Sequence, residues 1–503
     1  MKESSSVPGP RGSRWLGMVP QLRQDQLGTF QRAVAEYGDV VRLVVGPPGL
    51  RRDLYLVTHP DGVEQVLAGD PDGYSKNTPF YGEIAAYLGN GLLTSGGQRW
   101  RQQRRTVAPL FSHRRIDGYI DVMADEAARL ADRCAVSGVG GAPIDVNAAM
   151  VEYTLRTVGR VLFGADVDEA VPVIRATFPI LNEHVQRRGV SPSRLPRWLP
   201  TLGQVRAAAA QRAMYRVVDD IIDRRSGAPE SDLIAPLASL APRGSRREAR
   251  LLRRRSATNS MSPPSSSARR VARSDRDLIS LLLAARDPET GAPMSHQEVR
   301  DQVLIFLLAG HETTSTALTF TMHLLGRYPD VQAAVHREIV DVLDGRAPHA
   351  DDIGRLSLTE MAVKEALRLY PPAYSLGRIA EHEVTIAGHR IPAGSIILLS
   401  QWATHRRPDL WPDPERFNPA RFEPAAEQAR ARYAYFPFAG GLRGCIGGHF
   451  AMAEAVVATA TLLTRFSLVS DAPDIPLVTA ITLRPAGPVW CRLELRQPAS
   501  VLR

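Results

Sequence analysis

The chain has 503 residues, of which 44% are hydrophobic and 23% charged, with a formal net charge of +9. This balance is typical of a globular protein with a large buried core and excludes a fibrous or wholly disordered chain. Three scattered cysteines exclude a disulfide framework, and the polar N-terminus predicts no export signal, so we expect a cytoplasmic protein. The apolar runs are shorter than the ~20 residues of a membrane span, so no membrane anchor is expected.

The positive charge is concentrated in one segment. Residues 242–274 hold ten arginines and one glutamate. The formal charge of this segment is therefore +9, the same as the net charge of the whole chain. The segment is rich in Arg, Ser and Pro and lacks a hydrophobic period, so we predict a disordered insertion within a single domain spanning residues 1–503. A solvated linker and an arm that binds an acidic partner, a membrane surface or nucleic acid are both open. With the remaining charge formally balanced, no nucleic-acid partner is expected.

The N-terminal part predicts a helix followed by a β hairpin. The helix is expected over residues 27–37. Two β-branched or aliphatic runs, 39–45 and 53–58, are separated by Gly46-Pro-Pro-Gly, which is a hairpin signal. Residues 73–97 mix aromatic side chains with Gly, Asn and Thr and are predicted to form a long loop, which either lines a pocket or is pinned to the core by its aromatic residues.

A basic helix is predicted to begin at Gln98. Trp100 and Arg104 are four residues apart, so they share a face from which both can donate hydrogen bonds to one anion. The alternative is a solvated basic face. The neighbouring Arg101 and Arg105 are expected to be free to face outward.

A long buried helix is predicted in the second half of the chain, after four or five shorter helices between residues 116 and 226. It begins at the capping box Ser295-His-Gln-Glu298 and extends to about Arg327. Its apolar middle is followed by Gly310 and by His311-Glu-Thr-Thr314, residue types that weaken a helix. Such a conflict is expected at a functional site, although a satisfied polar patch in the core gives the same pattern.

A second capping box, Ser357-Leu-Thr-Glu360, predicts a helix that ends by Tyr370, because prolines follow. Glu365 and Arg368 are three residues apart on this helix and are expected to form an ion pair. Short strands are predicted at residues 394–400, around 478–483 and at 490–495.

The most distinctive stretch is 436–454, where one cysteine lies in a glycine-rich loop before a helix. Five of the nine residues at 440–448 are Gly, which lets the backbone approach a bulky flat ligand. The start of a helix favours the thiolate form of Cys445, and Arg443 adds a fixed positive charge. Two other interpretations are a glycine-rich turn with an incidental cysteine and a zinc site with His449, which supplies too few ligands.

The spacing Phe438-x-x-Gly-x-Arg-x-Cys445-x-Gly447 resembles the haem-ligand signature of the cytochrome P450 monooxygenases, with Ala439 at a position where Gly is frequent. Four more motifs follow the order of that family: Trp100-x-x-x-Arg104, Ala309-Gly-x-Glu312-Thr313, Glu365-x-x-Arg368 and Pro414-Glu-Arg416-Phe. The resemblance implies a mainly α fold with a small β region. In this fold a long central helix lies over a haem, and the cysteine loop lies on the proximal side.

The resemblance also implies roles for single residues. Cys445 would be the metal ligand of haem b, which is iron protoporphyrin IX. The other cofactor-binding positions are Trp100, Arg104, Arg378, Arg443, Phe438, Gly447 and Ala309. Glu312 and Thr313 would be catalytic, as an acid and alcohol pair that delivers protons to iron-bound oxygen. Arg416 is expected to join Glu365 and Arg368 in a network that fixes the cysteine loop.

The implied activity is a haem-thiolate monooxygenase of the soluble bacterial type, which inserts one atom of O2 into a hydrophobic substrate. The pocket positions by family resemblance are nearly all apolar: Phe80, Tyr81, Tyr87, Phe306, Leu307, Tyr374, Leu376 and Ile481. A terpenoid, fatty acid, sterol or polyketide would suit them. Electrons are expected from a ferredoxin or flavodoxin with its NAD(P)H reductase, docked near Arg101 and Arg105, and the protein is expected to be a monomer.

Two other functions stay open. One is a peroxide-driven or isomerising haem-thiolate enzyme, which usually lacks the acid and alcohol pair seen at Glu312 and Thr313. The other is a non-catalytic haem or ligand-binding protein that uses residues 242–274 to reach nucleic acid or a membrane. It predicts salt-sensitive binding that disappears when this segment is deleted.

Overall fold

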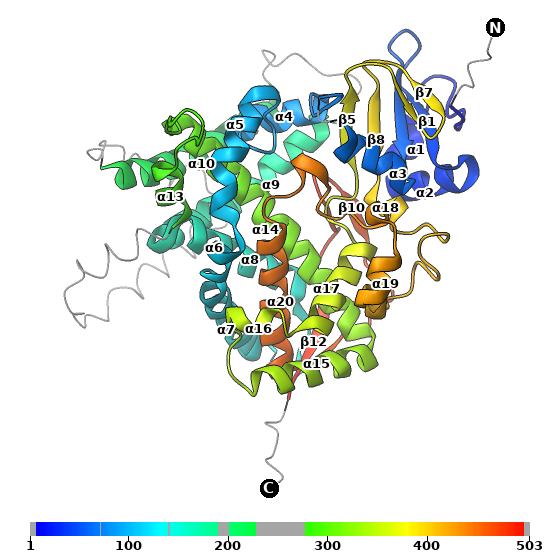
Figure 1. Ribbon diagram of the computed structural model, residues 1–503. Helices are drawn as coiled ribbons and strands as arrows, with labels where there is room; N and C mark the ends of the chain where they lie inside the picture. Colours follow the sequence, from blue (N-terminus) through cyan, green and yellow to red (C-terminus); the bar gives the residue numbers. More distant parts are fainter. Residues whose placement is uncertain (1–6, 71, 139–140, 190–200, 228–276, 497–503) are drawn as a thin grey trace.

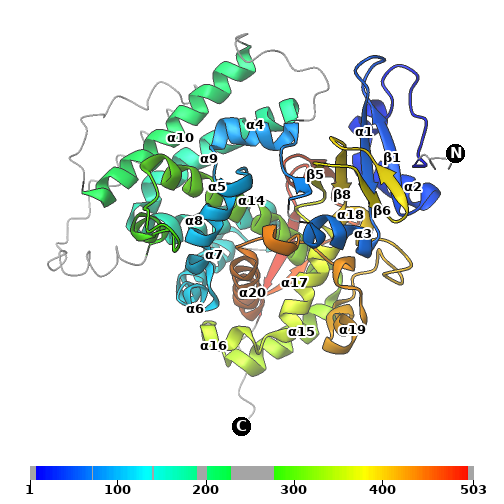
Figure 2. The same ribbon diagram turned by 45° about the horizontal axis from the view of Figure 1, so that its top comes forward.

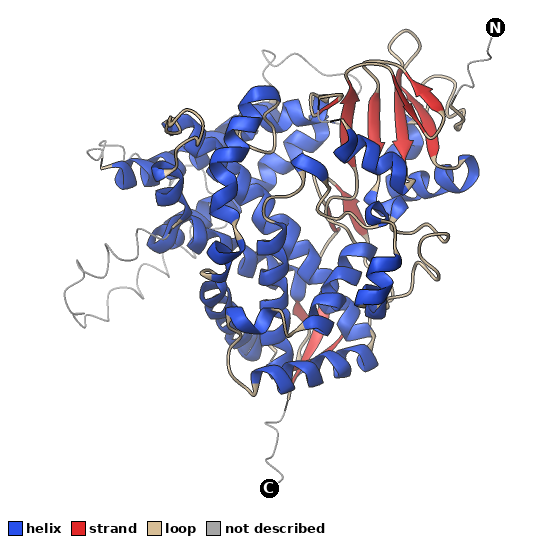
Figure 3. Cartoon of the chain, in the orientation of Figure 1, coloured by secondary structure: helices blue, strands red, loops and turns tan. Residues whose placement is uncertain are grey.

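The computed structural model describes residues 7–70, 72–138, 141–189, 201–227 and 277–496. Within these ranges the chain is mainly helical, and its largest sheet lies at one corner, near the N-terminus (Figure 1, Figure 3). The predicted insertion at 242–274 lies outside the described residues.

The helices, in chain order, have the following bounds: α1 Val19–Gln24, α2 Gln26–Tyr37, α3 Pro60–Glu64, α4 Pro79–Leu88, α5 Gly97–Val107, α6 His113–Asp117, α7 Ile120–Ser137, α8 Val146–Phe163, α9 Val167–Gly189, α10 Leu202–Ser226, α13 Leu278–Ala284, α14 His296–Arg327, α15 Pro329–Leu343, α16 Ala350–Ile353, α17 Ser357–Leu369, α18 Gln401–Thr404, α19 Pro424–Ala429 and α20 Gly448–Arg465. The strands are β1 Val40–Val45, β2 Arg52–Val57, β3 Tyr74–Ser75, β4 Ile144–Asp145, β5 Leu376–Ala380, β6 Val384–Ile386, β7 His389–Ile391, β8 Ile396–Leu399, β9 Phe466–Val469, β10 Leu477–Thr479, β11 Leu483–Pro485 and β12 Trp490–Leu495. The helix predicted at 27–37 and the strands predicted at both ends of the chain are confirmed.

The corner sheet joins segments that are far apart in the sequence, in the order β1-β2-β8-β5-β3. β1 and β2 form the predicted hairpin, with Val40 opposite Val57. β8 pairs in parallel with β2 and antiparallel with β5, so Arg378 of β5 lies opposite Ile397 of β8. Arg378 of this sheet thereby lies against the helical part, where it lines the same cavity as residues of α14.

α14 forms the centre of the helical part, as predicted. The Ser295 hydroxyl accepts a hydrogen bond from the N–H of Glu298, and the Glu298 carboxylate accepts one from the N–H of Ser295, so this capping box is confirmed. The helix packs against α8, α17 and α20 and is buried throughout residues 303–308. Among the described helices it alone is long and apolar enough to cross a membrane, but 83% of that stretch is buried inside the protein.

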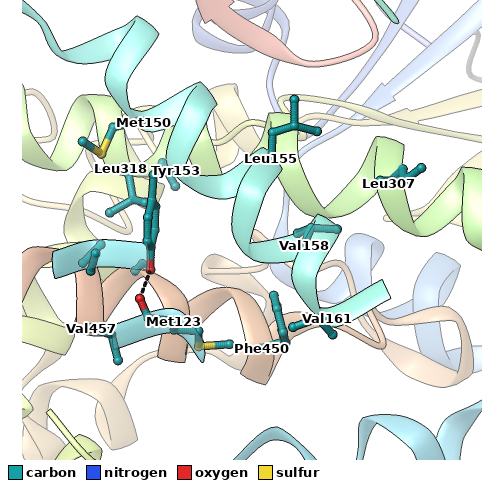
Figure 4. Packing of buried hydrophobic residues seen from close by; sticks show 14 of the residues in the cluster. Met123, Met150, Tyr153, Leu155, Val158, Val161, Leu307, Leu318, Phe450 and Val457 are labelled. Atoms are coloured by element: carbon teal, nitrogen blue, oxygen red, sulfur yellow. Dashed lines mark hydrogen bonds between the residues drawn. The ribbon is translucent and has the colours of Figure 1, made fainter. Parts of the chain in front are cut away.

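The core between α7, α8, α14 and α20 fixes the helix that follows the cysteine loop. Tyr153 of α8 is fully buried, and its hydroxyl lies 3.4 Å from the carbonyl oxygens of Met123 on α7 and Glu454 on α20 (Figure 4). Leu318 of α14 and Val457 of α20 belong to the same apolar cluster. Burial of these side chains sets α20, and hence the loop before it, against α14.

The prediction that residues 73–97 form one long loop is wrong, because the helix α4 lies within this range. The Thr78 hydroxyl accepts a hydrogen bond from the N–H of Tyr81 (3.4 Å), and Pro79 occupies the first helical position. Gly89, with φ 85°, ends the helix. Gly82 lies in the middle of α4, and a glycine in the sequence is typical of a loop. Burial of Tyr81 and Tyr87 on one face nevertheless favours the helix.

The second predicted capping box is also wrong. α17 begins at Ser357, and its N-cap residue Leu356 makes no side-chain capping hydrogen bond. The carboxylate of Glu338 on α15 instead accepts hydrogen bonds from the N–H groups of Leu358 (2.7 Å) and Thr359 (2.8 Å). A neighbouring helix thus satisfies the free donors of α17, which local sequence spacing cannot reveal.

Glu365 and Arg368 form the predicted ion pair and are fully buried, with Nε and Nη2 of Arg368 donating to the two carboxylate oxygens at 2.7 and 2.8 Å. The predicted third partner is wrong. Arg416 contributes only its backbone carbonyl, 3.3 Å from Arg368, whereas the side chain of Arg421 binds Glu365 at 3.3 Å. Arg368 also donates to the carbonyl of Pro414 (2.7 Å), so the pair holds the segment that leads toward the cysteine loop.

We expect Glu338→Ala to destabilise the protein by about 1 kcal/mol, because the first N–H groups of α17 lose their acceptor. The measurement is the midpoint of thermal unfolding, followed by circular dichroism. The matched control is Glu360→Ala, which removes the carboxylate of the predicted capping box. Equal losses in the two variants would contradict the assignment of Glu338 as the cap.

Candidate active site

The loop before α20 holds Cys445 through its own backbone. The N–H of Cys445 donates to the carbonyl of Phe438 (2.9 Å), which closes the loop. Gly441 has φ 62°, and a side chain there would place its Cβ 1.9 Å from the carbonyl oxygen of Leu67. This position therefore requires glycine.

The departure from the family pattern at Ala439 has a conformational cost. Ala439 has φ 59°, in the left-handed region where a Cβ is crowded. An L-residue other than Gly loses about 1 kcal/mol there. This explains why Gly is frequent at the position, and the hydrogen-bonded loop on either side keeps the alanine in place.

Cys445 faces α14 across a cavity of about 290 Å³. The loop wall includes Phe438, Ala439, Ile446 and Gly447, and the opposite wall includes Phe306, Ala309, Gly310 and Thr313. The fold thus brings together two motifs that are more than a hundred residues apart in the sequence. Cys445 is exposed to the cavity but surrounded by protein, and this desolvation raises the pKa of its thiol, while the N–H of Gly447 and the charges of Arg104 and Lys76 act in the opposite direction.

The polar part of this cavity is cationic. Lys76, Arg378 and Arg443 line it, and no acidic side chain among the described residues does. Burial, together with the charges of Arg378 and Arg443, lowers the pKa of Lys76 well below its usual value. Three basic side chains without an acidic partner in the cavity wall favour a ligand whose carboxylates would balance Arg378 and Arg443 and restore the charge of Lys76. No sequence motif identifies Lys76 as a site residue, because it stands alone in its segment.

Trp100 and Arg104 lie behind the cysteine loop rather than in the cavity wall. The guanidinium of Arg443 lies 4.2 Å from the centre of the Trp100 ring. Nη1 of Arg104 donates to the carbonyl of Gly444 (3.1 Å). In this structure both residues support the loop that carries Cys445 and Arg443.

Arg101 faces outward, as expected, and Arg105 is partly exposed, but both side chains are paired with acids. Arg101 forms an ion pair with Asp72, and Arg105 forms one with Glu289 at 2.8 Å and a longer one with Asp287. These acidic residues belong to other segments of the chain. The net positive charge on the surface of α5 is therefore smaller than the sequence of α5 alone suggests.

Glu312 and Thr313 point to different surroundings. Thr313 lines the cavity, and its hydroxyl donates to the carbonyl of Ala309 (2.5 Å). Glu312 is buried outside the cavity, where Oε1 accepts a hydrogen bond from Nδ2 of Asn182 on α9 (2.6 Å). Burial raises the pKa of Glu312, and Arg484 and Asn182 partly oppose this shift.

The surroundings of Glu312 include buried acceptors that lack a protein donor. Among the described residues, none donates a hydrogen bond to Oδ1 of Asn182 or Oε1 of Gln186, whereas the Thr482 hydroxyl lies near the Glu312 carboxylate and acts to lower its pKa. Gln186 lies one turn after Asn182 on α9, and its Nε2 donates to the carbonyl of Thr479 (3.1 Å). Buried acceptors of this kind usually bind ordered water. No sequence pattern singles out Asn182, because α9 and α14 meet only in the folded chain.

The predicted pocket residues divide into two groups. Tyr81, Phe306 and Leu376 line the cavity, whereas Phe80, Tyr87, Leu307, Tyr374 and Ile481 do not. The hydroxyl of Tyr87 binds Nε2 of His184 (2.8 Å), and that of Tyr374 donates to the carbonyl of Ala480 (3.2 Å). The sequence analysis missed much of the apolar lining: Leu93, Leu110, Phe111, Tyr119, Val158, Val161 and Leu162.

Comparison with known proteins agrees with this geometry. The cytochrome P450 family model matches residues 7–492. Cyclooctatin synthase of Streptomyces melanosporofaciens is 35% identical over 440 residues, which cover 87% of this chain and 85% of the relative. Pentalenene oxygenase of Streptomyces avermitilis is 32% identical over 474 residues, which cover 93% of this chain and 92% of the relative.

A solved structure confirms the predicted fold. The haem domain of cytochrome P450DA superposes with a TM-score of 0.80 at 25% identity and covers 98% of each chain. The Cys445 loop, the central helix α14 and the motif order all agree with a match that spans nearly the whole chain. The chain therefore belongs to the cytochrome P450 family of haem-binding monooxygenases.

Proposed function

We propose that this enzyme oxidises a terpenoid-like substrate in the cavity between Cys445 and α14, with haem b as its cofactor. The observation that carries the proposal is an apolar cavity with a cysteine on one wall, a threonine on the other and three cations in its lining. Relatives at 35%, 33% and 32% identity are named as cyclooctatin synthase, cyclooctat-9-en-7-ol 5-monooxygenase and pentalenene oxygenase. These names favour a polycyclic terpenoid over a fatty acid, a sterol or a polyketide.

The residues present fit a haem. Cys445 would ligate the iron, Phe438, Gly447 and Ala309 would border the flat ring, and the cations Lys76, Arg378 and Arg443 would pair with its two carboxylates. Trp100 and Arg104 would help to bind the haem by positioning Arg443 and the backbone of the Cys445 loop. When bound, haem supplies a thiolate-ligated iron that activates O2 for attack on a C–H bond.

The chain itself would hold and move protons on the α14 side. The Thr313 hydroxyl can rotate between the Ala309 carbonyl and the cavity, so it can donate at the place where oxygen is activated. Glu312 can exchange protons with water held by the free acceptors of Asn182 and Gln186. Burial raises the pKa of Glu312 above that of an ordinary glutamate, which favours its protonated form over a wider pH range. The two neighbouring residues thereby connect the cavity with a separate polar site.

We further propose a separate electron donor, a ferredoxin or flavodoxin with its NAD(P)H reductase, and a monomeric enzyme in the cytoplasm. The bacterial relatives of this chain support a separate donor. The ion pairs of Arg101 and Arg105 leave little unbalanced charge on α5, so these two residues alone do not define the docking face.

The proposed function predicts oxidation of a polycyclic terpenoid. Candidate compounds, pentalenene among them, are first screened for a change in the haem spectrum on binding. A compound that binds is then incubated with a surrogate ferredoxin, its reductase and 18O2. We expect a product with one labelled oxygen atom. Oxidation of fatty acids, with no terpenoid bound or oxidised, would contradict the proposed substrate class.

The ligand role of Cys445 predicts a strongly red-shifted Soret band when carbon monoxide binds the dithionite-reduced enzyme. We expect Cys445→Ala to abolish this band, because the thiolate is removed. Cys134→Ala, which changes a buried cysteine of α7, is the matched control and should keep the band. A wild-type band at the position of histidine-ligated haem would contradict the assignment.

Thr313→Ala should leave haem binding intact and raise the share of electrons lost to hydrogen peroxide several-fold, because the hydroxyl donor at the cavity is removed. Peroxide and product are measured per NAD(P)H consumed. Thr321→Ala is the matched control, since Thr321 makes the same type of bond, to the carbonyl of Ala317 at 2.8 Å, outside the cavity lining. Equal peroxide yields in the wild type and Thr313→Ala would refute the role.

A further inference from the structure

A largely buried segment without helix or strand lies between α4 and α5, and we call residues 89–95 the linking segment. It lies directly on α14: a Cβ added to Gly89 would be 2.2 Å from Oδ1 of Asp301, and one added to Gly91 would be 2.8 Å from the Asp301 carbonyl oxygen. Glycine at both positions permits this contact. The flanking helices α4 and α5, drawn in shades of blue, lie close together near α14 in two views (Figure 1, Figure 2).

Side chains of α14 hold the backbone of the first half of the linking segment. The N–H of Asn90 donates to Oδ2 of Asp301 (2.8 Å), and the N–H of Leu92 donates to Oε1 of Gln302 (3.0 Å). Asp301 and Gln302 are both buried. Because buried hydrogen bonds are costly to break, this half of the segment is fixed to α14.

Gln103 of α5 holds the linking segment from the other side. Its Nε2 donates to the carbonyl of Asn90 (3.0 Å), and its Oε1 accepts a hydrogen bond from the hydroxyl of Ser95 (2.6 Å). Gln103 and Ser95 are 3% and 1% exposed, so bulk water cannot replace these bonds. One amide side chain thus uses its donor and its acceptor to tie together the two ends of the segment.

The linking segment in turn holds two of the cavity cations. Nζ of Lys76 donates to the carbonyl of Leu93 (3.4 Å), and Nη1 of Arg443 donates to the carbonyl of Ser95 (3.1 Å). Lys76 precedes α4 and Arg443 belongs to the cysteine loop, and both line the cavity. Two carbonyls of one segment therefore orient cations that come from separate parts of the chain.

We propose that Gln103 is a positioning residue for the haem, which fixes the linking segment so that Lys76 and Arg443 face the haem carboxylates. This role rests on the proposed haem site and belongs to a residue that does not line the cavity. Cations held near the ring favour the ferrous form, because reduction adds an electron, and they also bind the carboxylates. Gln103 therefore raises the reduction potential and slows the loss of haem.

Gln103→Leu in the full-length holoenzyme tests this role, because leucine can make neither hydrogen bond. We expect a lower reduction potential in a dye-coupled titration, and a transfer of haem to excess apomyoglobin that is several-fold faster than in the wild type. The red-shifted Soret band of the carbon monoxide complex should persist, since Cys445 is unchanged. Gln102→Leu is the matched control: Gln102 is the exposed neighbour on α5, so both values should equal those of the wild type.

Ser95→Ala gives a second test that keeps both cation-binding carbonyls. It removes only the hydroxyl that donates to Gln103, so we expect the same changes at smaller size. In Gln103→Leu combined with Ser95→Ala, the changes should be smaller than the sum of the two single changes, because the two residues share one bond. Ser95→Thr keeps a hydroxyl and should bring both values back toward those of the wild type. If Gln103→Leu does not fold, the two Ser95 variants carry the test.

An unchanged potential and unchanged haem transfer in Gln103→Leu and Ser95→Ala would overturn the role of Gln103. A lower midpoint of thermal unfolding, with both haem values unchanged, would do the same and leave Gln103 as a residue of the core only. These results differ from failure of the proposed function, in which the wild-type enzyme itself lacks the red-shifted Soret band. A wild type with that band and variants with unaltered haem values would refute the role of Gln103 alone.

Discussion

The buried pair of Glu365 and Arg368 is the interaction on which the site most depends. Both side chains are fully buried, so removing either would leave an uncompensated charge, at a cost of about 3–5 kcal/mol. Arg368 also binds the carbonyl of His405, and the His405 ring accepts a hydrogen bond from the N–H of Phe436, at the start of the cysteine loop. Burial and nearby arginines lower the pKa of His405 well below its usual value, which keeps this ring nitrogen free to accept.

The two walls of the cavity differ in how they are built. The Cys445 wall is an irregular loop, fixed by backbone hydrogen bonds, by the close approach of Gly441 to Leu67 and by the network around Arg368. The other wall is part of α14, which is rigid because its apolar residues are buried on all sides. A rigid helix facing a braced loop holds the distance across the cavity nearly constant. Preorganisation of this kind is what chemistry at a bound cofactor requires.

Several residues act through others rather than at the cavity. Trp100 packs against Arg443, Arg104 donates to the carbonyl of Gly444, and Asn182 donates to the carboxylate of Glu312. Each contact joins elements that are distant in the sequence. Trp100 and Arg104, which the family motif singled out, contact Arg443 and Gly444 of the Cys445 loop.

The sequence alone determined the elements with strong local signals. The capping box at Ser295, the apolar run of α14, the β1–β2 hairpin and the glycine-rich cysteine loop each follow from local chemistry, and the resemblance of the motifs to the cytochrome P450 family predicted the fold. Only the tertiary structure decided which residues satisfy buried groups. Glu338 caps α17, Arg421 binds Glu365, and Lys76 joins the cations of the cavity. These contacts depend on how helices and strands pack, and a hydrogen bond or charge pair between distant segments leaves no periodic pattern in either segment.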